Sequence, residues 1–134
     1  MNKKIVIDSS VYLSYVAYGK IYRLLDAIIT YNLIVYVNQE LLSELYKNIP
    51  KVIRVEGILA GEILNAIKIH SIEFITLSGF KGSPDPKDNF LFDLALQTGS
   101  EVIVTQEKAL LGFKDSPVPI HDLKWFKENY PVPL

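Results

Sequence analysis

Acidic side chains follow the short apolar runs of this sequence, at the points where those runs end. The candidate acids are Asp8 after residues 5–7, Glu44 after 33–37, Asp85 and Asp88 after 73–77, and Glu107 after 101–105. If they converge, two charges about 4 Å apart repel by about 4 kcal/mol at an effective dielectric near 20. Either their pKa values rise or a cation lies among them. Carboxylates without His or Cys suit Mg²⁺ or Mn²⁺, ions that promote phosphodiester hydrolysis.

The apolar runs themselves predict buried strands that alternate with helices. Strands are expected at 4–8, 33–37, 73–77, 101–105 and 118–120, because β-branched runs without strict alternation are typical of parallel strands covered on both faces. Helical spacing predicts helices over 10–17, 20–31, 38–47, 55–70 and 86–99. Asn38 is expected to cap the third of these helices, and Pro50 to stop it.

This alternation predicts the fold class and the place of the site. We expect residues 1–134 to form a single domain, a three-layer α/β/α fold around a mainly parallel sheet of about five strands. In such sheets ligands bind beyond the carboxyl ends of the strands, where the strand order reverses. The acids named above follow those ends.

Composition excludes several other kinds of site. The chain has 134 residues, a formal charge of −1, no cysteine, and two histidines far apart, His70 and His121. Disulfides, thiolate chemistry and zinc–thiolate sites are therefore absent, and a histidine metal cage is not expected. No secretion signal follows Lys3 and Lys4, and no apolar run reaches membrane-spanning length. We expect a cytoplasmic protein that does not associate with membranes.

Each acid also has a structural interpretation. Asp8 can cap the helix that follows it, and Asp85 and Asp88 have good turn and capping chemistry. Glu44 borders leucines that face the core, an expensive place for a carboxylate without a partner. Glu107 can be an exposed first-turn acid. Two further acids, Asp93 and Asp122, are expected to be solvated and are set aside.

Five segments, in order, resemble the PIN domain family, and in particular its branch of VapC-like toxins from toxin–antitoxin systems. The segments are "VIDSSVYLS", "VNQELLSELYK", "DPKDNFLFDLAL", "EVIVTQEKALL" and "VPIHDLKWF". The third is the most specific, since it has an Asp-x-x-Asp turn that leads into an apolar helix. The sequence departs from the family pattern at Ser10, where asparagine is commonest, and at Glu107 and Ala109, where aspartates are usual.

The resemblance implies a metal-dependent ribonuclease that binds Mg²⁺ or Mn²⁺ and cleaves RNA to 3′-hydroxyl and 5′-phosphate ends. It also implies a homodimer that is held inactive by a partner antitoxin. The metal-binding and catalytic acids would be Asp8, Glu44, Asp88 and Glu107, with Ser9, Ser10, Asp85 and Thr105 in support.

A second interpretation remains open. Ala109 offers no metal ligand, and the near-neutral net charge gives no general attraction for RNA. Under this second interpretation, the chain is a PIN-fold domain with weakened or lost catalysis that binds RNA or a protein partner. In either case Arg23, Lys47, Lys51 and Arg54 are candidate contacts for an RNA backbone, with tyrosines available for base stacking.

Overall fold

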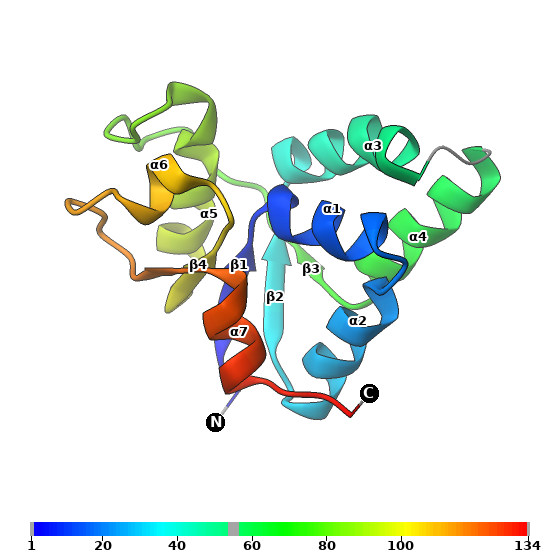
Figure 1. The fold of residues 1–134 in the computed structure, drawn as a ribbon. Coiled ribbons are helices and arrows are strands. Elements are labelled where there is room, and N and C mark those ends of the chain that lie inside the picture. The colour runs from blue at the N-terminus through cyan, green and yellow to red at the C-terminus, as the bar shows by residue number, and fades with distance from the viewer. Residues whose placement is uncertain (1, 54–56, 134) are drawn as a thin grey trace.

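The computed structural model describes residues 2–53 and 57–133, which form one sheet between two layers of helices (Figure 1). The predicted contact Arg54 lies outside the described residues. The strands are β1 (Lys4–Ile7), β2 (Ile34–Val37), β3 (Ile72–Glu73), β4 (Val102–Val104) and β5 (Ile120–His121). The helices are α1 (Ser9–Ala17), α2 (Ile21–Thr30), α3 (Gln39–Ile53), α4 (Gly57–Ile69), the 3-10 turn η1 (Pro86–Asp88), α5 (Asn89–Thr98), α6 (Lys108–Leu111) and α7 (Leu123–Asn129).

The sheet is parallel throughout and has the order β3-β2-β1-β4-β5. β1 is central and completely buried along Ile5, Val6 and Ile7, which explains its unbroken apolar sequence. The chain adds β2 and β3 on one side of β1, and then β4 and β5 on the other. The strand order therefore reverses between β1 and β4, where such folds bind ligands.

Alternate residues of β1 supply two cores, one on each face of the sheet. Ile5 and Ile7 pack in the core that includes residues of α1, α2, α3, α4 and α7. Val6 packs in the other core, with residues of α5 and α6. Figure 1 shows the same division, with α5 and α6 on one side and α1 to α4 on the other. The predicted three-layer α/β/α fold is confirmed.

The third strand is shorter than the sequence predicts. A strand was expected over 73–77, but β3 pairs with β2 only through Ile72 and Glu73. β2 ends at Val37, so the chain beyond β3 has no strand to pair with. The amide of Leu77 donates instead to Oε1 of Gln97 over 2.8 Å, and this side chain replaces the missing backbone partner.

The helix ends show one error and two confirmed predictions. Pro50 does not stop α3, which continues to Ile53. A proline removes its own backbone donor and crowds the preceding turn, but Ile49 beside it is buried and keeps this turn packed against the core. Asn38 caps α3 as predicted, because its Oδ1 accepts from the amide of Leu41 at 3.0 Å. Gly99 closes α5 with a left-handed φ of 69°.

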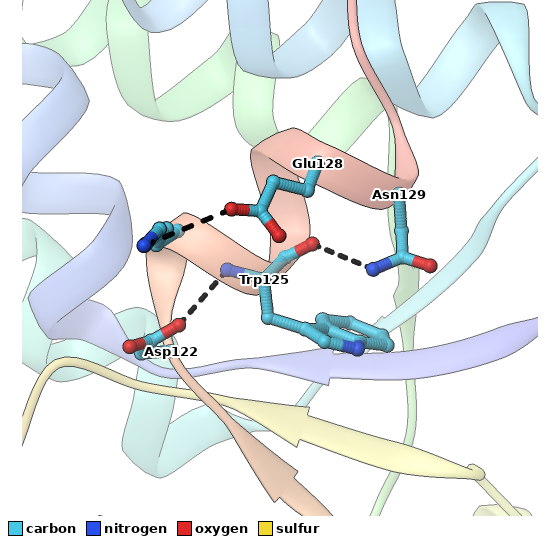
Figure 2. Close-up of polar contacts among 5 residues, drawn as sticks. Asp122, Trp125, Glu128 and Asn129 are labelled. Atoms are coloured by element: carbon cyan, nitrogen blue, oxygen red, sulfur yellow. Dashed lines mark hydrogen bonds and ion pairs between the residues drawn. The ribbon is translucent and has the colours of Figure 1, made fainter.

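Polar contacts within and just before α7 fix that helix at both ends (Figure 2). Asp122, which was expected to be merely solvated, accepts from the amide of Trp125 at 2.9 Å and so caps the helix. Asn129 donates to the carbonyl oxygen of Trp125 at 2.8 Å. Lys124 and Glu128 form an ion pair one turn apart, at 4.0 Å. None of the helices within the described ranges has the length and hydropathy needed to cross a membrane.

Candidate active site

Asp8 is buried at the carboxyl end of β1 and is held by two hydroxyl groups. It occupies the N-cap position of α1, but its side chain makes no capping hydrogen bond. Its Oδ2 accepts instead from Ser10 Oγ and from Thr105 Oγ1, each at 2.8 Å. Thr105 lies there because β1 and β4 are paired neighbours, with Ile7 opposite Val104. Asp8 therefore does not act as an ordinary helix cap, which the sequence had left open. Its carboxylate lies at the switch point of the sheet instead.

Glu44 is brought to Asp8 by the packing of α3 against α1. Ser9 lies between them, with its Oγ 3.3 Å from Glu44 Oε1 and 3.5 Å from Asp8 Oδ1. Burial raises the pKa of Glu44, the charge of Asp8 raises it further, the hydrogen bond from Ser9 lowers it, and the charge of Asp88 raises it. Glu44 therefore borders the buried side of its helix, as the flanking leucines predicted, and faces two other acids.

Asp88 enters from the opposite layer, at the start of α5. It is 8% exposed, and its side chain makes no capping bond to that helix. Asp85 has the local structural role, since its Oδ1 accepts from the amide of Lys87 at 3.0 Å and caps η1. Burial raises the pKa of Asp88, and the charges of Asp8 and Asp85 add to this rise, whereas the contact with Glu107 and the charge of Lys87 oppose it.

Glu107 is half-buried beside Asp88 rather than exposed. It is the N-cap residue of α6, and its backbone amide donates to Thr105 Oγ1 at 3.0 Å. Burial, the contact with the Asp88 carboxyl and the nearby acids raise its pKa from 4.5 to about 8. Two carboxyls can hydrogen-bond only when one carries a proton. Its Oε2 is buried and accepts no hydrogen bond from the described part of the chain.

The donors at this site have the chemistry that Mg²⁺ or Mn²⁺ requires. They are carboxylates and hydroxyls, and a cation would satisfy the buried Oε2 of Glu107. It would also offset the burial and the mutual repulsion that raise three pKa values. Across residues 2–53 and 57–133, no group of three or more acidic, His or Cys side chains is arranged so that it could hold a metal ion. The residues therefore fit the ion in type, and their side chains would have to rearrange around it.

The structure brings together all four predicted acids and the supporting residues Ser9, Ser10 and Thr105, while the Asp85 side chain caps the neighbouring turn. Ala109 is exposed on α6 and has no side-chain oxygen. Sequence reasoning missed that the amide of Gln106 donates to Ser10 Oγ at 3.1 Å, because a backbone donor leaves no trace in the residue type.

Asp93 was wrongly expected to be solvated. It is 6% exposed, and its Oδ1 accepts from the amides of Gly79 and Phe80 at 3.1 and 2.7 Å. These bonds tie the segment after β3 to α5. The two partners are backbone amides 13 and 14 residues away, so spacing along the chain gave no signal of the contact.

The protein belongs to the class of parallel α/β/α proteins, with acids clustered at the switch point of its sheet. Comparison with known families identifies its family. The sequence profile of the PIN domain matches residues 4–109. The chain belongs to the PIN domain family, whose members are generally nucleases. A search of curated proteins found no match.

Proposed function

We propose that this protein is a metal-dependent endoribonuclease, the VapC-like toxin of a toxin–antitoxin pair. The observation that carries the proposal is the meeting of Asp8, Glu44, Asp88 and Glu107 from four separate segments at one end of the sheet. Four carboxyl groups at one place repel one another when no cation lies among them. Metal-dependent cleavage of RNA, as proposed from the resemblance to the PIN domain family, would explain why they are gathered there. We extend the proposal to residues 1–134 acting as one domain.

The chain's own residues have distinct roles in this proposal. Asp8, Asp88 and Glu44 would hold Mg²⁺ or Mn²⁺, with Glu107 completing the set. When bound, the ion would supply a more acidic water and a positive charge for the phosphodiester oxygens. Ser10 and Thr105 are positioning residues, because their hydroxyls fix the orientation of the Asp8 carboxylate. Ser9 keeps Asp8 and Glu44 adjacent in spite of their like charges.

The decisive experiment compares RNA cleavage with Mn²⁺ by the natural protein and by Asp8→Asn, Asp88→Asn and Glu44→Gln. Each change keeps the shape of the side chain and removes a charge. We expect each to lower cleavage by about 100-fold or more, since even indirect supports of a metal centre contribute about 10–100-fold. The matched control is Glu40→Gln, which removes an exposed acid one turn before Glu44 on the same helix and should keep full activity.

Equal cleavage by the natural protein and all three site variants would contradict the assignment. The second candidate function, a PIN-fold module that binds RNA or protein without cleaving it, is favoured by Ala109, which offers no ligand on α6. That module predicts no cleavage and no Mn²⁺ binding by the natural protein. A calorimetric titration with Mn²⁺ therefore separates the two functions, even when the RNA used in the cleavage assay is a poor substrate.

The proposed partners follow from the same resemblance. We propose a cytoplasmic homodimer that is inhibited by a cognate antitoxin protein. Light scattering of the purified chain should give twice the monomer mass of 15.2 kDa. A monomer that is fully active on RNA would remove dimerisation from the proposal without affecting the assignment of the acids.

A further inference from the structure

A pocket of about 420 Å³ lies between α1, α2, α7 and the segment after α7. This volume suits one small ligand. The pocket contains none of the acids described above. α1 separates the two places, because its first residue, Ser9, contacts the acids, whereas Ser14, Tyr15 and the C-cap residue Tyr18 line the pocket.

The described residues that line the pocket carry a concentrated positive charge and no negative one. Lys20, Arg23 and Lys127 line it, and no carboxylate side chain of the described residues does. The one ion pair in the described part of the chain joins Lys124 to Glu128, so the acid nearest Lys127 on α7 is already engaged (Figure 2). Three cations held together in this way favour a ligand with more than one negative charge.

The start of α2 adds to this positive field. Lys20 is the N-cap of α2 and makes no side-chain capping bond, and the first turn contains Arg23 and no acid. Lysine and arginine are unfavourable at this end of a helix, because the helix dipole is positive there. A bound anion would satisfy the helix end and the side chains together.

Tyrosine rings give the pocket a second, aromatic character. Tyr15 and Tyr130 are almost completely buried, and Lys127 Nζ lies 5.6 Å from the centre of the Tyr15 ring. Tyr130 is fixed in place by edge-on contact with Tyr31, at 5.3 Å between ring centres. Tyr18, which also lines the pocket, is 78% exposed and leaves a free ring face for stacking.

We propose that this pocket binds a nucleoside 5′-phosphate, with the phosphate against Lys20, Arg23 and Lys127 and the base on a tyrosine ring. Cations and aromatic rings together recognise this combination of phosphate and planar base. The ligand has two possible sources, a free mononucleotide or the 5′-terminal nucleotide of an RNA. The site does not depend on the proposed ribonuclease activity, because it shares no residue with the acidic cluster.

The test is calorimetric titration of the full chain in EDTA with AMP, adenosine, inorganic phosphate, and a tetraribonucleotide with and without a 5′-phosphate. AMP should bind more tightly than adenosine or phosphate. Arg23→Gln should weaken AMP binding about tenfold, the usual size of one charge-assisted hydrogen bond. Lys68→Gln, an exposed lysine of α4 that does not line the pocket, is the matched control and should leave binding unchanged. Tighter binding of AMP than of the phosphorylated tetranucleotide supports a free nucleotide, and the reverse order supports an RNA end.

Several outcomes would overturn the proposal. One is the absence of binding by AMP and by the phosphorylated tetranucleotide at millimolar concentration. Another is an equal loss of AMP binding in Arg23→Gln and Lys68→Gln, and a third is phosphate binding as tight as that of AMP. Tighter binding of a glutamate-rich peptide would assign the pocket to a protein partner instead. Tyr18→Ala, at an exposed position that does not endanger folding, should weaken AMP but not phosphate. Asp88→Asn should bind AMP normally, and failure to do so would place the ligand at the acidic site.

Discussion

At the scale of single residues, the acidic site combines well-satisfied and poorly satisfied carboxylates. Asp8 accepts two short hydrogen bonds from hydroxyls. Glu107 lies against another acid with one buried oxygen unpartnered in the described chain. The fold thus fixes one carboxylate firmly and keeps another under electrostatic strain. A buried carboxyl oxygen without a partner lowers the stability of the folded protein.

The raised pKa of Glu107 predicts how stability depends on pH in EDTA. Its pKa rises from 4.5 to about 8 on folding, so the folded state binds the proton more tightly than the unfolded state. The stabilising contribution is complete below about pH 4.5 and is lost as the pH rises through about 8. We expect the melting temperature of the metal-free protein to fall over this range, as measured by thermal unfolding followed by circular dichroism.

Glu107→Gln should flatten this pH dependence and raise the melting temperature at pH 8 by a few degrees. Glu44 and Asp88 also have raised pKa values, so a shallower slope should remain. Glu40→Gln, an exposed acid away from the cluster, should keep the full slope. A melting temperature that rises steadily between pH 5 and 8 in the natural protein would contradict the electrostatic account.

At the scale of elements, the sequence predicted the strands of the centre better than those of the edge. β1 and β4 are buried on both faces, and their β-branched runs are a direct consequence of that burial. The short β3 could not be predicted, because its length is set by where β2 ends and not by its own residues. Pro50 misled for a related reason: local propensity favours a helix end there, and packing of Ile49 overrides it.

Two glycines test how far local backbone geometry stabilises the helices. Gly99 closes α5 at φ 69°, whereas Gly61 lies inside α4, and an added Cβ would meet no atom within 4 Å at either position. Gly99→Ala should therefore destabilise the protein by about 1 kcal/mol through backbone strain alone. Gly61→Ala should stabilise it by about 0.5–1 kcal/mol, because alanine loses less entropy in a helix. Urea unfolding measures both, and equal signs would contradict this explanation.

At the scale of the whole molecule, the site depends on both helical layers. Asp8 and Glu44 come with the layer of α1 and α3, and Asp88 comes with the layer of α5 on the other face. The sequence predicted this convergence because acids after parallel strands must reach the same edge. It could not predict which hydroxyls and amides orient them, since those contacts join residues up to 97 positions apart.

The aromatic side chains that pack in the α5 layer should contribute strongly to the free energy of unfolding. Phe92 is completely buried, stacks on Phe80 at 4.5 Å and meets Phe113 edge-on at 5.6 Å between ring centres. Phe92→Ala should lower the free energy of unfolding by about 3–5 kcal/mol in urea denaturation. Leu77→Ala, at a side chain that is 76% exposed, should change it by less than about 0.5 kcal/mol. Comparable losses in the two variants would show that this core is not the main support of the layer.

The pairing of β4 with β1 also has a consequence for synthesis of the chain. Thr105 reaches Asp8 across 97 residues, and Glu107 lies two residues after Thr105. Contacts this distant form late, after a large loss of chain entropy. Since the ribosome releases the N-terminal part first, a nascent chain that already carries Asp8, Glu44 and Asp88 still lacks the strand that completes the site. The four acids can therefore come together only after synthesis has passed residue 107.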